Sequence, residues 1–239
     1  MNEEDMACVT QEFIRAAQLC RDAGFDAVEI HMGHGYLLNQ FISPLSNKRT
    51  DQYGGSAENR VRFPARVLAA VKQAVGKDLA VLVKISVADG VKNGTQVEDS
   101  VITARALEEA GANMLVLSGG RNIESTWYMF GSRMNRDEIG KVLKQQGERL
   151  LAFAMKLSAS SEPEVTFKEM YFLENSRQIR AAVDMPLAYV GGSKSLANAE
   201  QAIAEGFDCV VMARALIHDS ALVNKFKSGE VTQSGCDNC

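Results

Sequence analysis

The chain has 239 residues, 46% of them hydrophobic, which is enough to bury the core of one large α/β domain. Its formal net charge of −4 lacks the basic footprint of a nucleic-acid-binding protein, so we expect no nucleic acid as a partner. Its apolar runs are short and its first residues are acidic, so we expect neither a membrane span nor a signal peptide.

Five cysteines at irregular spacing, without a secretory signal, predict reduced thiols in a cytoplasmic protein. The last two, Cys236 and Cys239, form a single CxxC pair. This pair offers two ligands, which is too few for a zinc or iron–sulfur site, so we expect no metal.

The first predicted strand, residues 25–30, leads directly into two of the chain's three histidines. His31 and His34 follow its carboxyl end, and Tyr36 comes two residues later. In sheets of alternating strands and helices, loops converge and ligands bind at this end. Two imidazoles and a phenol there offer hydrogen-bond donors, acceptors and a proton donor. The alternative is that they only cap the strand and satisfy nearby backbone groups.

Alternating helices and strands run along the whole chain, which predicts an α/β fold with parallel strands. Residues 37–56 are expected to form an ordered loop over the site. Residues 121–165 are expected to be an insertion that walls off a substrate pocket, with a helical piece around 138–157. The predicted strands are 25–30, 79–85, 114–117, 187–190 and 209–212, and the predicted helices are 2–23, 57–75, 97–110, 167–183, 196–205 and 221–228.

Lys84 is the single charge in the otherwise apolar strand 79–85. A lysine near the carboxyl end of a covered strand is costly unless it faces a ligand or an anion. We therefore expect a site role for Lys84. The alternative is a side chain that extends out to solvent at the end of the strand.

Glycines follow two of the later strands. Gly119, after the strand 114–117, permits close approach of the backbone to a ligand. The strand 187–190 ends in Gly191 and Gly192, and the strand 209–212 ends in Ala213 and Arg214, each next to a helix start. Backbone amides and an arginine there predict a phosphate cradle after the last two strands. Ordinary turn chemistry is the alternative.

Resemblance to a known family is carried by one long block, AGFDAVEIHMGHGYLLNQFISPLSNKRTDQYGGSAENRVRF. It resembles the Old Yellow Enzyme family of FMN-dependent NAD(P)H:flavin oxidoreductases. The resemblance continues through VLVKISVADG, LEEAGANMLVLSGG, MYFLENSRQIRAAVDMPLAYVGGSKS, GFDCVVMARALI and SGCDNC. It implies a (β/α)8 TIM barrel that holds FMN at the carboxyl ends of its strands, with NADH or NADPH as reductant.

The resemblance also implies residue roles. His31 and His34 match the pair that hydrogen-bonds the oxygen of a small electron-poor acceptor: an activated alkene, a nitro compound or a quinone. Tyr36 matches the general acid that protonates the neighbouring carbon. Lys84 matches the cation beside the flavin ring, and Gly192, Ala213 and Arg214 match the phosphate-binding positions. Gly119 and Gly191 are also expected to contact the cofactor.

The sequence departs from the family in length, because five strands are predicted where a closed barrel has eight. The resemblance implies that residues 1–239 are the carboxyl-terminal part of one FMN-binding barrel domain, either a fragment or a shortened product. Two long sheet edges would then be exposed, so we expect a homo-oligomer or a missing amino-terminal segment to cover them. Two other functions stay open: a flavin-free barrel that acts as an interaction module, and a lyase that uses Lys84 as a Schiff-base nucleophile.

Overall fold

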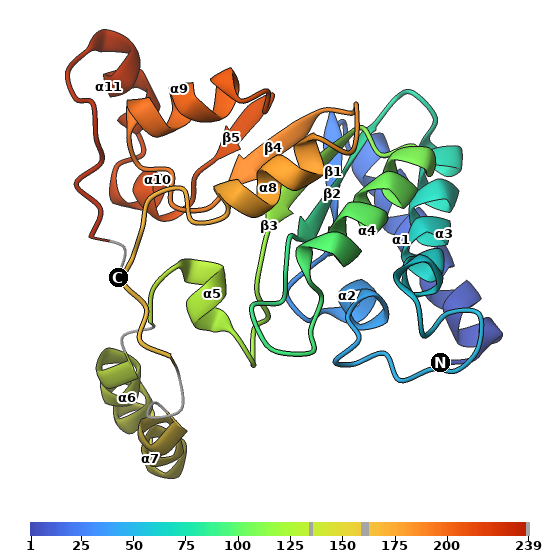
Figure 1. The fold of residues 1–239 in the computed structure, drawn as a ribbon, viewed down its shortest axis with the longest axis horizontal. Coiled ribbons are helices and arrows are strands. Elements are labelled where there is room, and N and C mark those ends of the chain that lie inside the picture. Colours follow the sequence, from blue (N-terminus) through green and yellow to red (C-terminus); the bar gives the residue numbers. More distant parts are fainter. Residues whose placement is uncertain (134–135, 159–162, 238–239) are drawn as a thin grey trace.

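Five parallel strands form one sheet, in which strands adjacent in the sequence are adjacent in space (Figure 1). The computed structural model describes residues 1–133, 136–158 and 163–237. The prediction of an α/β fold with five parallel strands is confirmed. The strands are β1 (Ala27–Met32), β2 (Ala80–Ser86), β3 (Met114–Ser118), β4 (Leu187–Val190) and β5 (Cys209–Val211).

Helices connect the strands and pack along the sheet. α1 packs against β1 and α3, and α8 packs against β4 and α4, so the helices form a continuous layer. Figure 1 shows α6 and α7 side by side, away from the sheet and beyond α5. The helices are α1 (Glu3–Asp22), α2 (Leu37–Ile42), α3 (Ala57–Val75), α4 (Val97–Glu109), α5 (Thr126–Phe130), α6 (Arg136–Gln145), α7 (Arg149–Ser158), α8 (Leu173–Arg180), α9 (Leu196–Ala204), α10 (Arg214–His218) and α11 (Leu222–Ser228).

The two faces of the sheet differ in burial over β1 and β2. Ile30, Val81 and Val83 belong to the hydrophobic core beneath the helices and are at most 5% exposed. The residues that alternate with them, such as Glu29 and Leu82, are exposed or half-buried. This alternation follows from the two-residue period of a strand. The less covered face is the one that carries the predicted site residues of these two strands.

The sheet has two edges among the described strands, because β1 and β5 each pair with one neighbour. The two expected edges are present, but the one at β5 is only three residues long. A parallel edge presents unpaired N–H and C=O groups, which natural proteins normally cover.

Two predicted elements near the histidines need correction. β1 begins and ends two residues later than predicted, so His31 lies within the strand and not after it. The segment 37–56 was expected to be a loop throughout, but its first six residues form α2. Leu38, Phe41 and Ile42 are buried there at helical spacing, and this burial stabilises the short helix.

Two predictions in the second half of the chain were wrong in detail, and two short helices there were not predicted. The helical piece around 138–157 is two helices, α6 and α7, because Gly147 between them adopts a left-handed backbone with φ of 87°. The helix predicted over 167–183 is only α8, since Met170 also has a positive φ and interrupts the helical backbone before it. The two short helices are α5 and α10, and neither was predicted because five residues are too few for a periodic pattern.

Candidate functional site

The carboxyl end of β1 brings together the three residues predicted to act on a substrate. The ring centres of His31 and His34 are 4.9 Å apart, and those of His31 and Tyr36 are 5.1 Å apart. Tyr36 is 54% exposed, whereas both histidines are half-buried. An aromatic hydroxyl therefore lies at the solvent side of a pair of imidazoles.

An unusual backbone turn orients His34. Its φ is 60°, and that of the following Gly35 is 84°, so two consecutive residues adopt the left-handed region. A non-glycine residue adopts this region rarely and at a cost in free energy. The Nε2 atom of His34 lies 2.8 Å from Ser118 Oγ, and its backbone N–H donates to Ser86 Oγ at 3.2 Å. Serines at the ends of β2 and β3 thus hold the imidazole that follows β1.

Both imidazoles are held in their neutral form at pH 7. Burial lowers the pKa of His34 to about 4, with smaller contributions from His31 and Lys84. Burial also lowers the pKa of His31, helped by the positive charge of Lys84 and opposed by Glu29. Among the described groups, His31 Nδ1 is a buried atom without a hydrogen-bond partner. A neutral imidazole can donate one hydrogen bond to a ligand oxygen without carrying a charge.

Lys84 has an anionic partner that was not predicted. Its Nζ lies 2.6 Å from Glu29 Oε1, and both side chains are partly exposed. Strands β1 and β2 pair His31 with Lys84, which places Glu29 on the same face of the sheet. The sequence contained a signal for the pair of Glu29 and Lys84. Glu29 and His31 are two residues apart in β1, so their side chains lie on the same face of the sheet as the side chain of Lys84.

The predicted phosphate residues line one cavity of about 240 Å³. Its walls include three cationic side chains, Lys84, Lys194 and Arg214, and the lining residues include no Asp or Glu. Lys194 and Ser193 were not among the predicted cofactor residues, although they follow the two glycines directly. The predicted residues in this wall are His34, Lys84, Gly191, Gly192, Ala213 and Arg214.

The phosphate end of FMN fits this cavity. Ser193 Oγ is buried and has no hydrogen-bond partner among the described residues, so it is a polar group that a ligand could satisfy. Lys194 and Arg214 are two cationic side chains on a wall whose lining residues include no carboxylate, and this is the donor set that a phosphate monoester requires. Arg214 also donates to the carbonyl of Phe130 at 2.7 Å, and Lys194 donates to the carbonyl of Cys236 at 3.0 Å. These bonds hold the two cations at the cavity wall.

Gly119 does not line this cavity. A Cβ atom added there would lie 2.7 Å from Phe172 and 3.1 Å from Tyr128, so the position requires glycine for packing. Gly191 is also close to Phe172, with a Cβ distance of 2.7 Å, but it lines the cavity as well. The structure thus brings together five of the six predicted cofactor residues.

The predicted insertion contributes to the cavity through α5. Met129 and Phe130 line it, and Tyr171, which precedes α8, donates a hydrogen bond to the carbonyl of Met129 at 2.8 Å. The described parts of α6 and α7 do not line this cavity. Residues 134–135 and 159–162 of the predicted insertion lie outside the described part of the chain.

Two other cavities differ in character. One of about 320 Å³ lies at β1 and is lined by Phe13, His31, Tyr36, Leu37 and Leu38, so it offers an apolar surface beside the two site residues.

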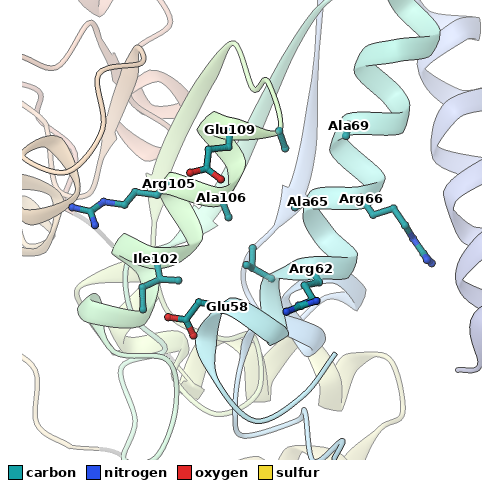
Figure 2. Close-up of a pocket in the computed structure, with 11 residues that line it drawn as sticks. Glu58, Arg62, Ala65, Arg66, Ala69, Ile102, Arg105, Ala106 and Glu109 are labelled. Carbon is teal, nitrogen blue, oxygen red and sulfur yellow. The ribbon is translucent and has the colours of Figure 1, made fainter. Parts of the chain in front are cut away.

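The larger one, of about 690 Å³, lies between α3 and α4 (Figure 2). Alanines form its floor, and Arg62, Arg105, Glu58 and Glu109 surround it. It contains none of the predicted site residues.

The described residues contain no cluster of three or more His, Cys, Asp or Glu side chains that could hold a metal ion. None of their helices combines the length and the apolar composition needed to cross a membrane.

Comparison with protein families and curated proteins gave clear matches. The NADH:flavin oxidoreductase / NADH oxidase family matches residues 1–147. A 4,4'-dithiodibutanoate disulfide reductase of Rhodococcus erythropolis is 40% identical over 97% of this chain and 57% of its own length. An NADPH dehydrogenase of Bacillus subtilis (strain 168) is 39% identical over 54% of this chain and 38% of its own length. The chain thus spans little more than half of the first of these relatives.

Solved structures share the fold. A 2-naphthoyl-CoA reductase complex aligns with all of this chain and 32% of its own, with a TM-score of 0.76 and 23% identity. An old yellow enzyme homologue from Zymomonas mobilis aligns with 98% of this chain and 55% of its own, with a TM-score of 0.68 and 22% identity. The five strands are therefore arranged as part of a TIM barrel of this type.

Proposed function

Since the chain belongs to the NADH:flavin oxidoreductase / NADH oxidase family, we propose that it acts in an FMN-dependent NADH or NADPH oxidoreductase of the ene-reductase type. One observation supports this most strongly. His34, one of the three predicted acceptor residues, lines the same cavity as the predicted cofactor residues Lys84, Gly192, Ala213 and Arg214. A phosphate-anchored cofactor would extend from the arginine toward the histidines.

Bound FMN would supply hydride exchange between the reduced nicotinamide and the acceptor. Arg214 and Lys194 hold the phosphate through charge-assisted hydrogen bonds, and Ser193 Oγ adds a further one. Lys84 places a positive charge on the wall of the same cavity. Its partner Glu29 fixes the ammonium group in position.

His31 and His34 bind the acceptor. As neutral imidazoles they donate hydrogen bonds to its oxygen, and this stabilises the negative charge that develops there. The exposed phenol of Tyr36, whose ring centre is 5.1 Å from that of His31, then gives a proton to the neighbouring carbon. Hydride and proton together complete a two-electron reduction of an activated alkene.

A second acceptor class is an organic disulfide. It is favoured by one observation, the 40% identity over nearly the whole chain to a relative named as a disulfide reductase. Reduction of a disulfide takes up the same hydride and proton and breaks the S–S bond to give two thiols. The apolar cavity at His31 and Tyr36 suits either an alkene or an alkyl disulfide.

The two other functions considered from the sequence gain no support. A Schiff-base lyase needs a neutral amine at Lys84, but the ammonium form is paired with Glu29 at 2.6 Å. A flavin-free interaction module gives no account of a cavity lined by three cationic side chains and by Ser193, whose buried hydroxyl has no hydrogen-bond partner among the described residues. The described cysteines are free thiols, which suits the cytoplasmic location that we propose.

The experiment is turnover by the FMN-loaded chain. NADH or NADPH oxidation is followed with an activated alkene and, separately, with a dialkyl disulfide. We expect the wild type to consume one of these acceptors and the double variant His31→Ala, His34→Ala to lose that turnover while it keeps its flavin. The control is His218→Ala, because His218 is the exposed third histidine on α10. Normal turnover by the double variant would contradict the proposed roles.

A further inference from the structure

Arg121 is a buried charge that the proposed chemistry does not use. It follows β3, is 5% exposed, and forms an isolated parallel bridge with His34. The N–H of its neighbour Asn122 donates to the carbonyl of His34 at 3.1 Å. Figure 1 shows α2 and α5, the helices that begin after these two residues, at the same end of the sheet. A buried arginine therefore lies directly beside the turn that carries the imidazole.

The guanidinium of Arg121 is held on two sides. Its Nε and Nη2 atoms donate to the two carboxylate oxygens of Glu124 at 3.1 and 3.2 Å. These bonds from Arg121 hold the pKa of Glu124 below its usual value. Nη1 donates to Oδ1 of the buried Asn39, at 3.3 Å. The carboxylate of Glu124 thus balances the positive charge on the Nε and Nη2 side of the guanidinium, and Nη1 on the other side contacts Asn39.

Asn39 connects the arginine to the turn. The Oδ1 atom that accepts from Arg121 also accepts from the backbone N–H of Gly35 at 2.8 Å. The amide nitrogen of Asn39 donates to the carbonyl of Met32, at the end of β1, at 3.4 Å. An unbroken chain of hydrogen bonds therefore runs from Glu124 through Arg121 and Asn39 to Gly35.

The turn needs such support because its backbone is unfavourable. His34 and Gly35 both have positive φ, and this conformation costs free energy in residues other than glycine. The guanidinium lies against Gly35, since a Cβ atom added there would be 3.6 Å from Cζ and Nη2 of Arg121. The arginine fills the space beneath the turn and fixes the orientation of its amide.

The backbone of Arg121 is also held by hydrogen bonds. Its backbone N–H donates to Ser125 Oγ at 2.8 Å, and that hydroxyl donates in turn to the carbonyl of Asp89, in the loop after β2. Asp89 Oδ2 accepts from Ser43 Oγ at 2.6 Å. The loops after β1, β2 and β3 are therefore connected through buried polar contacts around Arg121.

We propose that Arg121 is a positioning residue that holds the turn of residues 33–36 in the conformation that aims His34 and Tyr36 at the acceptor. The importance of this orientation rests on the proposed function. This role requires the several nitrogen atoms of a guanidinium, because Nε and Nη2 pair with Glu124 while Nη1 reaches Asn39. A lysine has a single nitrogen and cannot hold both at this separation.

The test measures amide hydrogen exchange at Gly35 by NMR in the whole chain. In Arg121→Met we expect this amide to exchange about ten-fold faster than in the wild type, the order set by the loss of one buried hydrogen bond. Amides in the centre of β3 should change less than three-fold. Arg121→Lys should give an intermediate rate at Gly35.

The matched control is Arg177→Met. Arg177 also forms a two-bond pair with a glutamate, donating to Glu205 at 2.6 and 2.7 Å, but on the exposed side of α8. It should leave exchange at Gly35 unchanged.

An unchanged Gly35 rate in Arg121→Met would overturn the proposal, as would an equal acceleration at Gly35 and throughout β3. If Arg121→Met does not fold, a wild-type rate at Gly35 in Arg121→Lys would overturn it. The exchange measurement needs neither flavin nor acceptor, so this experiment fails or succeeds separately from the turnover assay.

Discussion

The neutral state of His34 gives a measurable dependence of stability on pH. Its pKa is about 4 in the folded chain, against 6.5 for an unperturbed histidine. Below pH 6.5 the unfolded chain therefore binds a proton that the folded chain does not bind, and this favours unfolding. The contribution of His34 to the free energy of unfolding is retained above pH 6.5 and is lost as the pH falls toward 4.

The magnitude follows from the pKa difference of about 2.5. Each unit of pKa corresponds to about 1.4 kcal/mol, so the fully developed effect is about 3.4 kcal/mol, of which about 2 kcal/mol is reached at pH 5. His34 is only half-buried, and solvent screening reduces the value. We therefore expect a loss of about 1 kcal/mol from His34 between pH 7 and pH 5.

The assay is urea denaturation of the wild type and of His34→Gln at pH 7, 6 and 5, followed by circular dichroism. The wild type should lose about 1 kcal/mol more than His34→Gln over this range. His218→Gln serves as the control, because His218 is exposed, and it should follow the wild type. If His34→Gln lost as much stability as the wild type, the burial and neutrality of His34 would be refuted.

Three further changes test other parts of the fold. Leu68→Ala should lower the free energy of unfolding, measured by urea denaturation, by about 2–5 kcal/mol, because Leu68 is fully buried. Leu150 is 85% exposed, so Leu150→Ala is the control, and an equal loss in the two variants would contradict the packing of Leu68. Asn2→Ala removes the side-chain cap of α1 and should lower the free energy of unfolding by about 1 kcal/mol; an unchanged value would argue against the cap. Glu29→Gln should change the free energy of unfolding by less than about 1 kcal/mol, since the ion pair with Lys84 is partly exposed. The same variant should bind phosphate more tightly in calorimetry, and weaker binding would speak against the cavity as a phosphate site.

Much of the fold could be predicted because its elements have strong local signals. The helix 57–75 was predicted with the observed bounds, since Ser56 caps it and its apolar residues repeat at helical spacing. The strand 187–190 was likewise predicted with the observed bounds, between Pro186 and two glycines. Errors arose where the backbone was decided by a single positive φ, as at Gly147 and Met170.

The candidate site could be predicted only in part. His31, His34 and Tyr36 adjoin one another in the sequence, so one strand end was enough to find them. Their supports come from other strands: Ser118, which contacts His34, is 84 residues away.

Arg121 was not found either, because its contact Asn39 is 82 residues away. No local pattern distinguishes a serine or arginine that holds a distant histidine from one that faces solvent.

The central claim, a flavin phosphate site at the ends of β4 and β5, is tested most directly by comparing FMN with riboflavin, which lacks the phosphate. Dissociation constants of both flavins for the purified chain can be measured by quenching of flavin fluorescence. We expect FMN to bind about 100-fold more tightly, the effect of one or two charge-assisted hydrogen bonds, and Arg214→Ala to remove most of this difference. Equal affinity for FMN and riboflavin, or no binding of either, would contradict the account.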